Sequence, residues 1–225
     1  MEIGIVKATD AISDKDVAFI AEACSQQAEE FCAAWGLPVV PVSFYVRGAA
    51  PSESVSHAFV IVDTIEPGML GMHTEWAGIP NAEVLLQDVA GTSSTCSHEV
   101  LEMIGDPLCN LWAPYTNGRR QAREAADRVE ADVYYEPVTI LGETRSMPVS
   151  NYLLPSAFVT DGAGPWDRMG RLTSWDGMTP GGYCIVQDAA GNVANVFADR
   201  VPETFARKLA NPNSRTLQRL RTRAA

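Results

Sequence analysis

The chain has 225 residues, of which 46% are hydrophobic and 20% are charged, and its formal net charge is −11 at pH 7. This length allows one domain with a substantial core, and the composition argues against wholesale disorder. No apolar run approaches the ~18 residues that span a bilayer, and the N-terminal MEIGIVKATD lacks the basic-then-apolar plan of a secretory signal. We therefore expect cytoplasmic synthesis and no membrane partner.

The strands and helix of the first half follow from periodicity. Apolar residues alternate over residues 2–9 as in a strand, and Ser13 with Asp16 then predicts the start of a helix. Apolar residues at helical spacing continue this helix over 14–35, and Gly36 ends it. Three further runs predict strands, at residues 39–48, 57–65 and 82–87, with a Gly/Pro-broken segment before the last.

A second helix includes TCSHEVLEMIGDP, residues 95–107, and the Gly105-Asp106-Pro107 stretch predicts its end. Beyond it, residues 117–132 predict a polar helix, or a turn followed by a helix. Three further segments predict β structure, at residues 133–141, 150–159 and 181–199, and the Gly- and Trp-rich residues 160–182 between them predict an ordered loop.

These elements predict an α+β fold with an N-terminal lobe over residues 1–110, a C-terminal lobe over 111–206 and a tail over 207–225. The tail carries six basic residues and no acid, so the body is more acidic than the whole chain. This asymmetry favours self-association or docking on an acidic partner, although a solvated terminal helix also explains it. The absence of aromatic residues among the arginines argues against nucleic-acid binding.

Five cysteines occur along the chain, an odd number without any C-x-x-C pair. This pattern argues against a disulfide framework and against a cysteine-based zinc site. We expect all five to be reduced, and Cys24 and Cys32 to be small buried hydrophobes of the first helix.

The second helix has a one-sided polar face. At 100° per residue, Glu102 lies about 40° and Glu99 about 100° from His98, whereas the apolar residues lie on the opposite arc. One interpretation is that this face meets water, but exposed faces normally mix charges and this one has no lysine or arginine. A histidine with carboxylates is better suited to a cation.

His98 and Glu102 are one turn apart, so both can bind one ion, as the histidines of H-E-x-x-H do. Glu99 is displaced toward the expected position of a water on that ion, which suits a general base. Asp106 lies about 12 Å from His98 along the axis, so we interpret it as a helix-end residue.

A further ligand must come from elsewhere in the chain. Glu124 and Asp127 form the best pair, one as a ligand and the other as a hydrogen-bond partner that orients His98. The alternative is a solvated acidic helix face paired with neighbouring arginines. His57 and His73 are more typical of structural histidines, and His73 is the better further candidate because GMHTEW precedes the strand expected beside the helix.

SHEVLEMIGDP, together with VSNYLLPSAF and GGYCIVQD, resembles a group of phage and prophage proteins with an S-H-E-x-x-E-x-x-x-D-P signature, which are zincin-like. The resemblance extends from about residue 40 onward. It implies a zincin-like fold: a mixed twisted sheet with an N-terminal helix, an edge strand and an H-E helix, then an irregular β-containing C-terminal lobe. It also implies a bound divalent metal, but no particular substrate.

Glu102 stands where the H-E-x-x-H motif has its second histidine, which adds a negative charge to the site. This charge lowers the Lewis acidity of the ion and raises the pKa of a water bound to it. Zinc remains the first expectation, and manganese or calcium also suits such a site.

Two functional hypotheses follow. The first is a metal-dependent peptidase or amide hydrolase, with His98, Glu102, and Glu124 or Asp127 on the ion and Glu99 as base; Tyr134 and Tyr135 are positional candidates for stabilising an oxyanion. The second is a catalytically silent zincin fold in a virion, as a capsid, neck or tail component. The basic tail and the loop containing Trp166 and Trp175 would then pack against other virion proteins.

Overall fold

The computed structural model describes residues 2–47, 55–65 and 69–199, so the predicted tail lies outside the described residues. Its main sheet has five strands in the order β2-β1-β3-β5-β4. The first four are parallel neighbours, and β4 pairs antiparallel with β5 at the edge. The strands are β1 (Glu2–Lys7), β2 (Val42–Tyr45), β3 (Val55–Val62), β4 (Gly71–Trp76) and β5 (Ile79–Leu85).

The expectation of a Gly/Pro-broken segment before β5 is wrong, because β4 forms there. Ala77 and Gly78 join the two strands in a two-residue turn, with φ of 52° and 80°. A turn with both central residues at positive φ matches the twist of a hairpin. An alanine at such a position is a weak sequence signal, which is why the hairpin is hard to predict.

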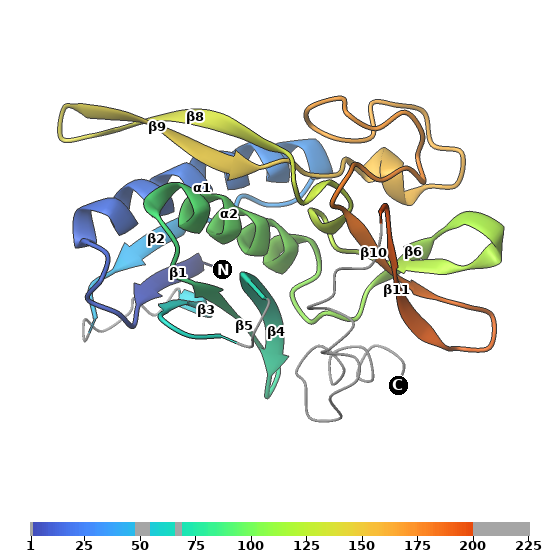
Figure 1. Cartoon of the computed structure of the whole chain (residues 1–225), viewed down its shortest axis with the longest axis horizontal. Helices are drawn as coiled ribbons and strands as arrows, with labels where there is room; N and C mark the ends of the chain where they lie inside the picture. The colour runs from blue at the N-terminus through green and yellow to red at the C-terminus, as the bar shows by residue number, and fades with distance from the viewer. Residues whose placement is uncertain (1, 48–54, 66–68, 200–225) are drawn as a thin grey trace.

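Two helices cover one face of this sheet, and a hairpin covers the helices (Figure 1). The helices are α1 (Asp14–Trp35) and α2 (Val89–Gly105), and the hairpin is β8 (Val133–Ile140) with β9 (Glu143–Ser150). Ser13 caps α1 by accepting from the Asp16 amide, and Gly36 ends it at φ 64°, as predicted. Ser97 of α2 accepts a 2.7 Å hydrogen bond from the Ser150 amide of β9. Both helices are therefore enclosed on two sides.

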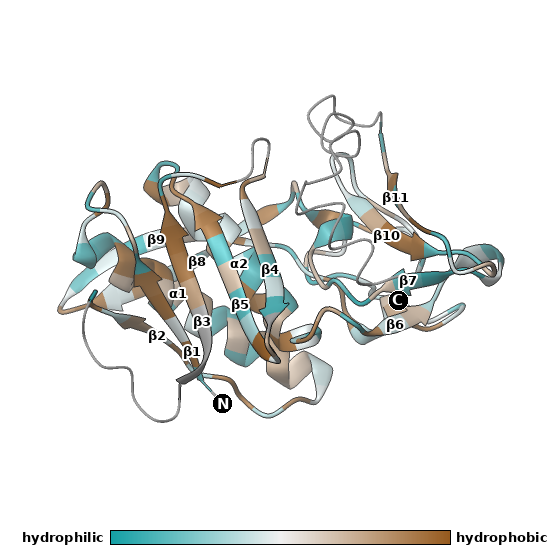
Figure 2. Cartoon of the chain, turned by 90° about the horizontal axis from the view of Figure 1, so that it is seen from below, coloured by the Kyte–Doolittle hydropathy of each residue, from teal (hydrophilic) through white to brown (hydrophobic). Residues whose placement is uncertain are grey.

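A second sheet lies beside the main one, as Figure 2 shows. Its strands are antiparallel in the order β11-β10-β7-β6. They are β6 (Trp112–Pro114), β7 (Arg120–Ala122), β10 (Tyr183–Gln187) and β11 (Val193–Phe197). The hairpin predicted over residues 181–199 is thus confirmed.

The helix predicted within residues 117–132 is wrong. The chain forms η1 (Thr116–Gly118), β7 and η2 (Asp127–Val129) instead, and the stretch 150–159 contains η3 (Pro155–Phe158) where β structure was expected. Residues 121–122 and 124–129 are all buried, so this segment has no solvent-facing side for a polar helix. Burial against the second sheet and the 160–182 loop overrides local helix propensity.

The α+β class is confirmed. One hydrophobic cluster joins α1, α2 and the main sheet to residues as late as Leu172, and the division into two lobes stays a prediction. All five cysteines are buried and free, as expected, and burial raises the pKa of the Cys24 thiol to about 12. Within the described ranges, no helix is both long and apolar enough to cross a membrane.

Candidate metal centre

Helix α2 carries three of the residues at the site. Asp88 caps its start by accepting from the Gly91 amide at 2.7 Å, and the helix ends at Gly105. Val100, Leu101 and Met103 are fully buried in the core. The polar face is buried too, since His98, Glu99 and Glu102, taken as whole residues, are only 8%, 5% and 1% exposed. The interpretation that this face meets water is therefore wrong.

His98, Glu102 and Asp127 form one group of converging ligand atoms. His98 Nε2 lies 3.2 Å from Glu102 Oε1 and 3.3 Å from Asp127 Oδ1. Two ligand atoms on a tetrahedral ion, each about 2.0–2.1 Å from it, are roughly 3.3 Å apart. His98 is therefore spaced from each carboxylate as two ligands of one cation would be, and all three ligand atoms lie within 4.8 Å of one another.

His73, Glu99 and Glu102 form a second group. His73 Nδ1 lies 3.1 Å from Glu102 Oε2 and 3.6 Å from Glu99 Oε2. His73 comes from the edge strand β4, and its side chain is fully buried. Gly71 on the same strand leaves room for Glu99, because a Cβ there would collide with the Glu99 carboxylate and the Thr95 methyl group.

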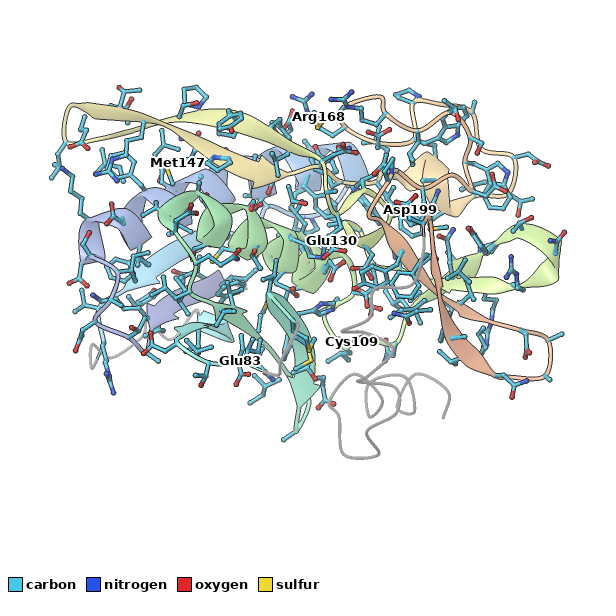
Figure 3. The ribbon with its side chains drawn as sticks, in the orientation of Figure 1. Glu83, Cys109, Glu130, Met147, Arg168 and Asp199 are labelled. Carbon is cyan, nitrogen blue, oxygen red and sulfur yellow. The ribbon has the colours of Figure 1, made fainter. Side chains whose placement is uncertain are left out.

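Glu124 and Asp127 separate in the structure. Asp127, on η2, contacts His98, whereas Glu124 Oε2 lies 3.5 Å from His73 Nε2. The prediction that both residues lie around His98 assumed a regular helix over residues 117–132. Figure 3 shows Glu130, next to η2, near the C-terminal end of α2, where this segment reaches the site.

His73 belongs to the cluster, although the sequence pattern is more typical of a structural histidine. Its position before the strand beside the helix was the available signal, but the hairpin that turns it toward α2 was not predicted. The Cys109 thiol, after the end of α2, donates to the His73 carbonyl at 3.9 Å and ties this turn to β4. The side chain of His57 lies outside what the structure describes.

Asp106 is the C-cap of α2, as predicted, and its carboxylate accepts from the amides of Asn110 and Leu111. Tyr134 is engaged away from the cluster: its hydroxyl accepts from Gln27 and donates to Glu30, both on α1. Tyr135 is 63% exposed on β8. Neither tyrosine is brought to the site.

Several buried polar atoms of the cluster have no hydrogen-bond partner among the described residues. They are both ring nitrogens of His73, Glu99 Oε2, Glu102 Oε1 and both carboxylate oxygens of Asp127. More than about nine in ten buried polar groups are normally bonded. Because these unbonded atoms converge, a cation is the partner that their chemistry suits.

The electrostatics show that the cluster has an excess of negative charge. Burial opposes a charge on either histidine, yet Glu124 and Glu102 hold the pKa of His73, and Glu102 and Asp127 the pKa of His98, well above the usual range. Burial also opposes the charged form of Glu102, but the two histidines hold its pKa well below the usual range. Burial and Glu102 together raise the pKa of Asp127 well above its usual range. Protons on the two histidines and on Asp127 thus offset part of the negative charge that a cation could neutralise instead.

Comparison of the chain with protein-family models, with curated proteins and with solved structures found no match. The functional argument therefore rests on the geometry. That geometry shows buried groups of histidine and carboxylate side chains that could hold a metal ion.

Proposed function

We propose that the protein is a zincin-like, divalent-metal-dependent hydrolase of peptide or amide bonds, in which His98, Glu102 and Asp127 hold an ion. The observation that carries this proposal is the convergence of these three side chains, at 3.2 and 3.3 Å, in a buried site on an H-E helix.

The order of the elements supports the zincin-like part of the proposal. After strand β1, the helix α1, the other four strands of the sheet, including its antiparallel edge strand β4, and the H-E helix α2 follow one another before the C-terminal part. Edge strand β4 and helix α2 both supply side chains to the cluster. This is the arrangement that the resemblance in the motif implies.

A divalent cation in such a set supplies an activated water and polarises the oxygen of a carbonyl group. The protein supplies one imidazole and two carboxylates that neutralise the charge of the ion. His98 and Glu99 are the most exposed side chains of the cluster, at 11% and 6%. A substrate would therefore approach from the side of His98 and Glu99, because Glu102 and Asp127 are almost completely buried.

The ligand set bears on the choice of metal. One nitrogen and two carboxylate ligands suit zinc, and the oxygen-rich character also suits manganese. Calcium is the weaker choice because it takes six to eight oxygen ligands.

Burial favours a second candidate function. Catalytic metal sites keep an open position, whereas the most exposed side chain of this cluster is only 11% exposed. A metal held for stability, in a catalytically silent zincin fold that serves as a virion component, is consistent with that enclosure. The two candidates share the ion and differ in whether it meets a substrate.

The test is metal content followed by hydrolysis. Purified protein loaded with Zn²⁺ or Mn²⁺ is expected to retain stoichiometric metal and to cleave an unstructured peptide mixture, with loss of cleavage on chelation and recovery on reloading. His98→Ala should lose hydrolysis, whereas Glu29→Gln, an exposed carboxylate on α1, should not. Wild-type protein without stoichiometric metal would overturn the proposal. Stoichiometric metal without any hydrolysis would overturn the hydrolase and favour the catalytically silent fold.

A further inference from the structure

We propose that the site holds two divalent cations, not one, bridged by the carboxylate of Glu102. One cation would lie on His98 and Asp127, and the other on His73 and Glu99. This inference rests on the metal binding of the proposed function and changes its stoichiometry.

The two oxygens of Glu102 face different histidines. Oε1 lies 3.2 Å from His98 Nε2, and Oε2 lies 3.1 Å from His73 Nδ1. Glu102 therefore belongs to both groups of ligand atoms, and within each group the atoms lie within 4.8 Å of one another. A carboxylate presenting one oxygen to each of two ligand sets is placed to bridge two ions.

His73 is the independent observation for the second ion. It is fully buried, and neither ring nitrogen has a hydrogen-bond partner among the described residues. Nδ1 points at the carboxylates of Glu99 and Glu102 on α2, and Nε2 points at Glu124. A ligating histidine almost always donates its other ring N–H to a carboxylate or carbonyl, and Glu124 is placed for that role.

Charge balance also favours two ions. Glu99, Glu102, Glu124 and Asp127 are all at least 95% buried. The ion pairs of Glu99, Glu102 and Asp127 within the described chain are to the two histidines. With neutral imidazoles, these three carboxylates carry one negative charge more than a single divalent cation neutralises in a low-dielectric site.

The second ion changes the role of Glu99. A general base needs an oxygen free to take a proton, whereas Glu99 Oε2 faces the same space as His73 Nδ1 and Glu102 Oε2, and Glu99 Oε1 lies against Gly71 of β4. Glu99 then acts as a ligand, and a pair of cations supplies the activation of water that the base was expected to provide.

The experiment counts the bound ions and measures whether they are magnetically coupled to each other. Metal-free protein is titrated with Mn²⁺ by calorimetry, and the bound metal is measured after desalting. We expect two equivalents and, at full loading, an exchange-coupled electron paramagnetic resonance spectrum. His73→Asn should bind one equivalent, and Glu102→Gln should weaken both sites by about tenfold or more. Circular dichroism and thermal melting verify that each variant is folded, and Glu29→Gln should bind two equivalents.

One equivalent in the wild type overturns the paired site, as do two equivalents in folded His73→Asn. An uncoupled spectrum at two equivalents, measured on the wild type alone, overturns the bridge even if the variants fail to fold. Loss of metal altogether overturns the proposed function as well. Two coupled ions without any hydrolysis would leave this inference standing and overturn the hydrolase.

Discussion

Position 71 of β4 lacks a side chain, and the Glu99 carboxylate occupies the space that a Cβ would fill. This close approach lets Glu99 turn toward His73, two residues further along the strand. The histidine and the glutamate are thus brought together at a residue that has no side chain of its own to offer an ion. Gly71 is a positioning residue for this half of the cluster.

Gly71→Ala should displace Glu99 and weaken Mn²⁺ binding at the His73–Glu99–Glu102 set by about tenfold, leaving the His98–Asp127 set unchanged. Titration calorimetry resolves the two steps. Gly105→Ala on α2 is the matched control, because its Cβ would meet only ordinary contacts, the nearest at 3.7 Å from Phe31 Cζ. Equal affinities for Gly71→Ala and wild type would contradict the steric argument.

At the scale of the elements, η2 is held in place by one buried side chain, that of Arg128. Arg128 is 1% exposed, and its guanidinium donates to the carbonyls of Gly177, Trp175 and Ala157, at 2.6–3.1 Å. It therefore holds the 160–182 loop, which contains no helix or strand beyond one isolated bridge at Asp167. Asp127 precedes Arg128, so the same anchor positions a ligand of the cluster.

Arg128→Met should lower the free energy of unfolding by about 3 kcal/mol or more, because it leaves the partly buried carbonyls of Trp175 and Gly177 and the buried Gln121 Oε1 without the donors that Arg128 supplies. Urea denaturation followed by tryptophan fluorescence measures this loss. Arg171→Met, in the same loop and exposed, should change the free energy of unfolding by less than about 0.5 kcal/mol. Similar losses for both variants would show that the guanidinium is not the anchor.

At the scale of the whole molecule, the cluster lies where three parts of the chain meet: edge strand β4, helix α2 and the segment that ends in η2. Repulsion among its buried carboxylates opposes the packing of these parts. A cation that binds only the folded chain relieves the repulsion and stabilises the whole fold.

At a free metal concentration 100 times the Kd, binding at one site should add about 2.7 kcal/mol to the stability. For a chain of this size that corresponds to a Tm increase of roughly 5–10 °C. Differential scanning calorimetry with Zn²⁺, and then with a chelator, measures the increase and its reversal. An equal increase in Glu102→Gln would place the stabilising ion elsewhere in the molecule.

Local sequence signals were enough to predict both helices. The Ser13 cap, the apolar spacing of α1, the stop at Gly105 and the placing of His98, Glu99 and Glu102 on one side of α2 depend only on helix geometry and near neighbours. A metal-suited face could therefore be inferred from the sequence alone.

The tertiary structure alone decided which residues complete that face. His73 lies 26 and 29 positions before its partners on α2, Glu99 and Glu102. The hairpin that brings it to them has only a weak turn signal in the sequence. Glu124 and Asp127 contact different histidines because burial replaces the helix that their sequence favours with a short strand and a single turn. Periodicity relates residues within one element, whereas contacts between elements depend on how the whole chain packs.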